Sequence, residues 1–163
     1  MKKLFVFSAM FVSLFATPIA LLSQDKTAIS PTYLEKYYQI SEALVKSNPA
    51  GASKSAKELA DLLKTAQQQG GGQAGKTADV QKKISQDLNT IAGTKDLEKQ
   101  RAAFQTLSDT FIAQIKKEKQ DKPAYVVYCP MKKAYWISAV EEVRNPYYGN
   151  AMLTCGNVSE TVK

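Results

Sequence analysis

Apolar residues recur every three or four positions through four successive segments within residues 30–117, which is the spacing of amphipathic helices. Ser30 followed by Pro31 predicts the start of the first helix, because serine caps a helix and proline suits its first turn. Asn48 followed by Pro49 predicts the start of the second in the same way. The pattern therefore predicts two capped helices in the first half of the chain.

The third helix is expected over about residues 77–91 and the fourth over about residues 94–117. Four amphipathic segments with short connections favour an antiparallel four-helix bundle. The positions expected to face the core are Leu34, Tyr37, Ser41 and Leu44; Ala52, Ala56, Leu59, Ala60 and Leu63; Val80, Ile84, Leu88 and Ile91; Leu97, Arg101, Phe104, Leu107, Phe111, Ile112 and Ile115.

A glycine-rich stretch, GGGQAGK at residues 70–76, interrupts the helical pattern. With Thr77 it satisfies the letters of a phosphate-binding loop, G-x-x-x-x-G-K-T. Such a loop follows a buried strand, whereas the preceding letters here are the polar end of a predicted helix. We therefore interpret the stretch as a linker between helices.

The pattern changes after residue 120, where the periodicity is no longer helical. AYVVY at 124–128 is β-branched and aromatic, which predicts a short strand. RNPYYGN at 144–150 predicts a turn, and AMLTCGNV at 151–158 predicts a second short strand. The sequence thus predicts a mainly α protein: an N-terminal segment 1–23, a helical bundle over 24–120, and an irregular or two-stranded appendage over 121–163 packed on it.

The composition of this 163-residue chain restricts the kinds of metal site and catalytic site it can form, because it contains no histidine. Zinc sites built on histidine, Ser-His-Asp and Cys-His catalysis, and c-type haem attachment are excluded. No pattern places paired carboxylates or an activated nucleophile, so the chain is not expected to be an enzyme.

The N-terminus predicts export, since Lys2 and Lys3 precede an uncharged, mostly apolar run from Leu4 to Leu22. Cleavage is expected near residues 20–24, giving a periplasmic or secreted protein; a retained membrane anchor is the alternative. Removing the two lysines lowers the formal net charge from +7 to +5, because residues 1–23 hold no acidic side chain. The remaining lysines are scattered among acidic residues, so no nucleic-acid partner is expected.

Both cysteines lie in the last part of the chain, each close to a methionine: Cys129-Pro130-Met131 and Met152-Leu153-Thr154-Cys155. In an oxidising compartment two cysteines commonly form a disulfide, and closing a loop of about 27 residues would stabilise the fold by roughly 3–4 kcal/mol. Thiolate and thioether sulfurs are also soft ligands that select Cu(I). The residues alone leave both interpretations open.

Three segments carry a family resemblance: 37–63, 101–116 and 127–156, the last with the pattern C-P-M, W, N-P-Y-Y-G and M-L-T-C-G. Over roughly residues 33–158 the chain resembles the exported bacterial family called domain of unknown function 3347. Members occur as small periplasmic proteins and as segments attached to the membrane-fusion subunits of heavy-metal efflux pumps. The resemblance implies a role in handling copper or a similar metal, with such a subunit as the partner.

The leading prediction is therefore a periplasmic protein that binds a soft metal ion, Cu(I) foremost. Cys129 and Cys155 are the predicted thiolate ligands, Met131 and Met152 the predicted thioether ligands, and Trp136 the aromatic that shields the site. The alternative is a structural or protein-interaction module with a Cys129–Cys155 disulfide and no metal. Membrane contact is expected only through the N-terminal segment if it is uncleaved, and the sequence does not predict an oligomeric state.

Overall fold

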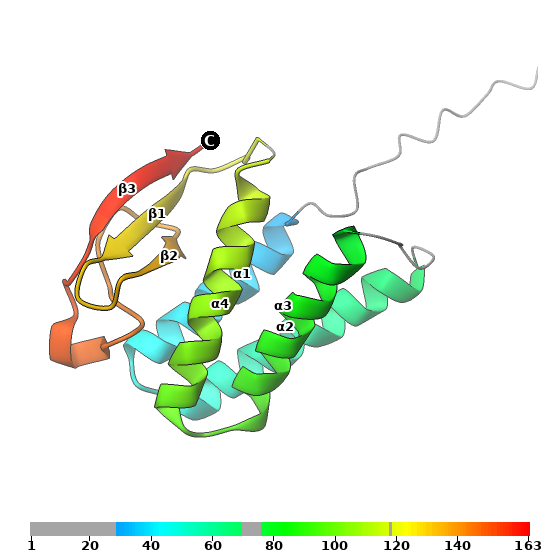
Figure 1. Ribbon diagram of the computed structural model, residues 1–163, viewed down its shortest axis with the longest axis horizontal. Coiled ribbons are helices and arrows are strands. Elements are labelled where there is room, and N and C mark those ends of the chain that lie inside the picture. Colours follow the sequence, from blue (N-terminus) through cyan, green and yellow to red (C-terminus); the bar gives the residue numbers. More distant parts are fainter. Residues whose placement is uncertain (1–28, 70–75, 118) are drawn as a thin grey trace, which may run out of the picture.

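The computed structural model describes residues 29–69, 76–117 and 119–163, and it is mainly helical with a small C-terminal sheet (Figure 1). The helices are α1 (Pro31–Val45), α2 (Pro49–Gln69), α3 (Lys76–Gly93) and α4 (Leu97–Ile115). Consecutive helices pack on one another in chain order, and α4 also packs on strand β2 (Ala134–Ser138). The predicted export segment lies outside the described residues, and within them no helix is long and apolar enough to span a membrane.

The predicted helix starts are confirmed at α1 and α2. Ser30 Oγ accepts a hydrogen bond from the Tyr33 N–H at 3.4 Å, and Asn48 Oδ1 accepts from the Gly51 N–H at 2.9 Å. The predicted start of α4 near Thr94 is wrong by three residues. Asp96 is the N-cap instead, because its carboxylate accepts from the N–H groups of Glu98 and Lys99.

The glycine-rich stretch joins α2 to α3. Residues 70–75 lie outside the described part of the chain, but the element before them is a helix and not a strand. The strand context that a phosphate-binding loop requires is therefore missing, and the linker interpretation holds.

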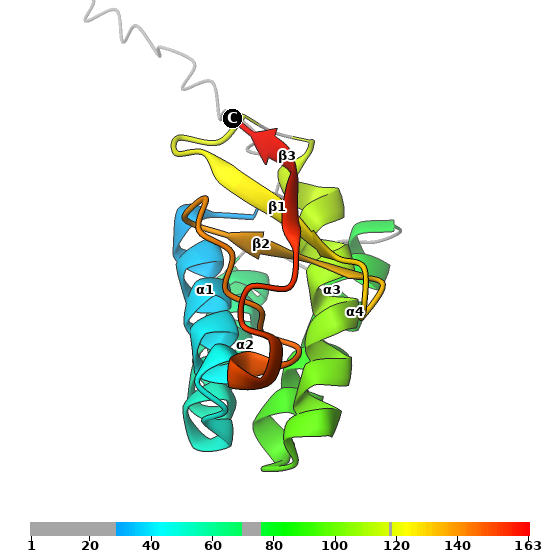
Figure 2. The same cartoon turned by 90° about the vertical axis from the view of Figure 1, so that its left-hand side faces the viewer.

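The C-terminal segment forms a three-stranded antiparallel sheet with the order β2-β1-β3 (Figure 2). The predicted strand at 124–128 is confirmed as β1 (Ala124–Cys129). The second predicted strand, at 151–158, is wrong: a 3-10 helix η1 (Gly149–Met152) and a turn occupy its first half, and β3 (Asn157–Val162) begins only at residue 157. Strand β2 was not predicted.

One continuous core joins the helices to the sheet. The largest fully buried side chains include Tyr37 and Phe104 from the helices and Trp136 from β2. Tyr37 stacks on Phe104 with ring centroids 5.0 Å apart, and Tyr147 lies 6.1 Å from Phe104 and 5.9 Å from Trp136. The sheet is therefore anchored to α1 and α4 by aromatic packing.

Candidate functional site

The two cysteines meet because β3 pairs with β1. Cys129 is the last residue of β1, and Cys155 lies two residues before the first residue of β3. The antiparallel register sets Tyr128 opposite Asn157, so the chain reaching β3 passes the end of β1. The two Sγ atoms lie 2.8 Å apart, although the residues are separated by 26 positions.

Cys129 is fully buried, whereas Cys155 is partly exposed. The hairpin turn after β1 folds back over the Cys129 sulfur, with the Lys132 N–H 3.4 Å from Sγ. Lys133 adopts a left-handed conformation with φ of 55°, and its N–H donates to the Cys129 carbonyl at 2.8 Å. The buried sulfur thus faces backbone donors, and the pair has one edge open to solvent.

The pKa values of the two thiols move in opposite directions. Burial raises the pKa of Cys129, but hydrogen bonds from Cys155, the Lys132 N–H, the Asn145 side chain and the Met131 N–H together lower it below its usual value. The hydrogen bond to Cys129 raises the pKa of Cys155. Cys129 is therefore the thiol of the pair that ionises first, and Cys155 is the one that keeps its proton to higher pH.

Each methionine is close to one cysteine in sequence: Met131 follows Cys129 by two residues, and Met152 precedes Cys155 by three. Met131 is 64% exposed. Met152 is half-buried in η1, and its carbonyl accepts from the Cys155 N–H at 3.1 Å. Across residues 29–69, 76–117 and 119–163, no group of three or more His, Cys, Asp or Glu side chains could hold a metal ion. A metal at the pair would therefore need these thioethers or an external ligand.

Trp136 lies under the segment that follows Cys155. It is 1% exposed, and a Cβ built on Gly156 would lie 2.8 Å from its ring. Tyr147 packs edge-on against the indole, and its hydroxyl donates to the Tyr135 carbonyl. Trp136 thus supports the chain at Cys155 from inside the core.

Two residues that matter for the site were not predicted to do so. Asn145 is fully buried and donates from Nδ2 to the Cys155 carbonyl at 2.7 Å, whereas the sequence marks it only as part of the N-P-Y-Y-G turn. Arg101 lies on the otherwise apolar face of α4. A charged residue at such a position was the one feature of the sequence that could have indicated its contact with the loop. Its guanidinium donates to the Pro146 carbonyl at 3.0 Å and to the Leu44 carbonyl at 3.1 Å, fixing the N-P-Y-Y-G loop against the end of α1.

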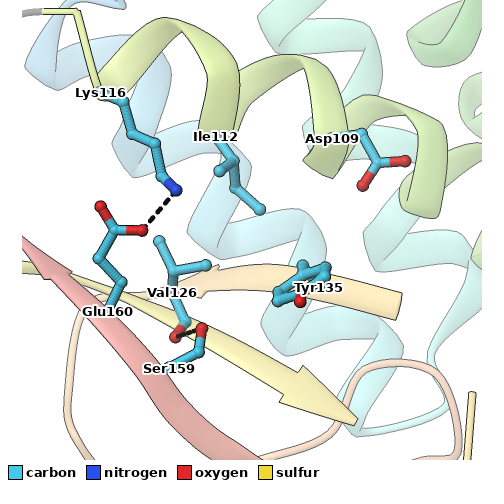
Figure 3. Close-up of a pocket in the computed structure, with 7 residues that line it drawn as sticks. All are labelled: Asp109, Ile112, Lys116, Val126, Tyr135, Ser159 and Glu160. Atoms are coloured by element: carbon cyan, nitrogen blue, oxygen red, sulfur yellow. Dashed lines mark hydrogen bonds and ion pairs between the residues drawn. The ribbon is translucent and has the colours of Figure 1, made fainter. Parts of the chain in front are cut away.

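The structure also has an open groove of about 320 Å³ between α4 and the sheet (Figure 3). Lys116 and Glu160 form an ion pair across one end, and the Ser159 hydroxyl donates to the Val126 carbonyl at 3.0 Å. The remaining lining residues are Asp109, Ile112 and Tyr135. Since its lysine and one of its two carboxylates already pair with each other, the groove carries less chemistry than the sulfur pair.

In a comparison with protein families, residues 33–122 match a family described as protein of unknown function (DUF3347). The chain belongs to this family. The matched residues begin inside α1, include α2 to α4 and end just before β1, so the DUF3347 match stops short of the sulfur pair. No curated protein and no solved structure matches the chain.

Proposed function

We propose that this DUF3347 protein is a non-enzymatic, exported protein that binds one soft metal ion, Cu(I) foremost, through Cys129 and Cys155. Met131 and Met152 supply further sulfur donors, and the helices form an antiparallel bundle that scaffolds the C-terminal segment. The observation that carries the proposal is the convergence of the two sulfurs, 2.8 Å apart, at an edge that solvent can reach.

The pKa shifts of the two thiols support this proposal. Metals bind thiolates, and the hydrogen bonds around Cys129 favour its ionised form. Binding a metal at both sulfurs displaces the proton of Cys155, whose pKa is raised. Cu(I) affinity is therefore expected to increase with pH until Cys155 has ionised.

The present separation of the two sulfurs is too short for both to bind one metal ion in a tetrahedral geometry, so one of them must move. A metal held by two sulfurs at about 2.3 Å would make an S–metal–S angle of only about 75° at the present spacing. Tetrahedral coordination needs the sulfurs about 3.8 Å apart. The partly exposed Cys155 is the side that can move outward by about 1 Å, because Cys129 is held in the core.

The same distance favours a second candidate, a structural or protein-interaction module with a Cys129–Cys155 disulfide. A disulfide requires a sulfur separation of about 2.05 Å, so the pair needs to close by less than 1 Å. The two states exclude each other, because a sulfur in a disulfide has no thiolate to offer a metal.

A membrane-fusion subunit of a heavy-metal efflux pump is the proposed partner of the metal-binding form.

Cu(I) competition against a chromogenic chelator, with reduced protein under anaerobic conditions, tests the metal site. We expect one Cu(I) per chain, and a loss of at least about 100-fold in affinity for Cys129→Ser or Cys155→Ser. Met131→Leu and Met152→Leu should each weaken binding by roughly tenfold, since each removes one soft donor. Thr154→Ser is the matched control, because Thr154 is exposed and adjacent to Cys155.

Equal Cu(I) affinity in the wild type and the double cysteine variant would contradict the metal site. Thiol counting on protein freshly isolated from the periplasm separates the two candidates. Two free thiols with bound metal support the first, whereas no free thiol and metal-independent stability support the disulfide.

A further inference from the structure

The groove between α4 and the sheet contains a carboxylate that no cation contacts directly. Asp109 is exposed on α4, and its side chain takes part in none of the ion pairs within residues 29–69, 76–117 and 119–163. Lys83 and Asp87 of α3 act on it from longer range, with opposite charges. Partial burial raises the pKa of Asp109, because the ionised carboxylate is incompletely hydrated. A cation that enters the groove therefore finds an available partner.

An aromatic ring lies at the same end of the groove. Tyr135 is 41% exposed on β2, and its ring packs against the ring of Tyr128 with centroids 4.6 Å apart. Figure 3 shows Asp109 and Tyr135 at one end of the groove, and the Lys116–Glu160 ion pair at the other. The face of a tyrosine ring attracts cations. This end thus presents a carboxylate and an aromatic ring together.

The middle of the groove is apolar, and an irregularity in the sheet shapes it. Ile112 of α4 and Val126 of β1 lie between the two ends (Figure 3). The register of β3 against β1 shifts between Val126 and Val127. Ser159 and Glu160 consequently both line the groove, although consecutive strand residues normally point to opposite faces. The apolar middle suits the aliphatic part of a long side chain.

The length of the groove fits a short extended peptide. Asp109 and Lys116 are seven residues apart on α4 and at its C-cap, which corresponds to about 10 Å along a helix. Three extended residues span about the same distance. The groove of about 320 Å³ is open, so a small free ligand would keep much of its surface in water. A peptide gains further contacts from the backbone on either side of its anchoring side chain.

We propose that this groove binds an arginine side chain from an extended segment of a partner protein. The guanidinium contacts Asp109 and the face of Tyr135, and its methylene groups lie over Ile112 and Val126. Arginine is favoured over lysine because its planar guanidinium can stack on a ring and also donate two hydrogen bonds to a carboxylate. Neither cysteine lines the groove, so the inference goes beyond the proposed metal site and does not depend on it.

NMR titration of the ¹⁵N-labelled, metal-free protein with a capped Gly-Arg-Gly tripeptide tests the site. We expect saturable shifts at the amides of Asp109, Ile112 and Tyr135, with a Kd on the order of 1 mM, because the contacts are partly exposed. Asp109→Asn should weaken binding about fivefold or more, and Tyr135→Leu about threefold. Asp61→Asn is the matched control, since Asp61 is an exposed carboxylate on α2 outside the groove and should leave the Kd unchanged.

Comparison ligands test the choice of arginine and of a peptide. A capped Gly-Lys-Gly tripeptide should bind about threefold more weakly, Gly-Gln-Gly should not saturate, and N-acetylarginine amide should bind more weakly than the arginine tripeptide. The proposal is overturned by an absence of saturable shifts in the groove, by an unchanged Kd in Asp109→Asn, or by equal Kd values for the arginine and lysine tripeptides. N-acetylarginine amide binding as tightly as the tripeptide would overturn the assignment to a peptide. Every measurement is made without metal, so its failure is distinguishable from failure of the Cu(I) site.

Discussion

At the residue scale, Gly156 is the position where the sulfur segment leaves no room for a side chain. A Cβ there would lie 2.8 Å from the Trp136 ring and 3.1 Å from the Tyr128 carbonyl. The residue also has φ of +150°, which L side chains rarely adopt. Gly156 thus lets the chain pass close over Trp136 directly after Cys155.

Gly156→Ala is expected to destabilise the fold by about 2–4 kcal/mol, through overpacking against Trp136 and backbone strain. Urea unfolding followed by Trp136 fluorescence measures the change in free energy. Gly93→Ala is the matched control, because nothing lies within 4 Å of its added Cβ. That variant should be neutral or stabilised by up to about 1 kcal/mol. Equal effects at the two glycines would show that the close packing at Gly156 is not a constraint.

At the element scale, strand β2 is covered along its outer edge by two tyrosines. The Ile137 N–H donates to the Tyr37 hydroxyl at 3.1 Å, and the Tyr147 hydroxyl donates to the Tyr135 carbonyl. The Tyr37 hydroxyl lies 2.6 Å from Ser108 Oγ, which itself donates to the Phe104 carbonyl at 2.7 Å. A chain of hydrogen bonds therefore runs from β2 through α1 to α4, and it satisfies strand-edge groups that would otherwise be buried without partners.

Tyr37→Phe should destabilise the protein by about 1–3 kcal/mol, because the buried Ile137 N–H loses its acceptor. Hydrogen exchange of the Ile137 amide should accelerate in step with the loss in stability, and urea unfolding gives the free energy. Tyr38→Phe is the comparison. The Tyr38 hydroxyl makes no hydrogen bond within residues 29–69, 76–117 and 119–163, so this substitution should change the free energy of unfolding little. A Tyr37→Phe protein as stable as the wild type would rule out a role for this chain of hydrogen bonds in stability.

At the scale of the whole molecule, the aromatic core makes helices and sheet one unit whose buried tyrosines must stay protonated. Burial raises the pKa of Tyr37 and of Tyr147 well above the usual value, and it raises the pKa of Tyr38 to about 12. An unfolded tyrosine ionises near pH 10. The native state therefore binds more protons than the unfolded state above that pH.

The contribution of these tyrosines to the free energy of unfolding should therefore be constant below about pH 10. It should be lost as the pH rises toward 12, because the unfolded state then ionises first. Absorbance at 295 nm reports tyrosinate, and far-UV circular dichroism reports folding. We expect the exposed tyrosines to ionise first and the buried ones only as the helices unfold. Ionisation of all eight tyrosines near pH 10 with the helices intact would contradict this expectation.

The sequence was sufficient for the helical part of the molecule. Helix formation depends on local signals, so the caps at Ser30 and Asn48 and the apolar stripes located four helices to within a few residues. It also identified the two cysteines as the chemically distinctive pair. The sheet was harder to predict, because strand pairing depends on contacts distant in sequence: β2 was missed, and β3 was expected several residues too early.

Only the tertiary structure decided how the sulfur site is assembled. The pairing of β3 with β1 brings Cys155 to Cys129. The side chain of Asn145, in the N-P-Y-Y-G turn ten positions before Cys155, donates to the Cys155 carbonyl at 2.7 Å. Arg101 fixes that turn from a helix more than forty positions away. Residue types determined what the site could bind, whereas long-range packing determined which of those residues meet, because side-chain contacts across 26 to 45 positions leave no periodic signal in the sequence.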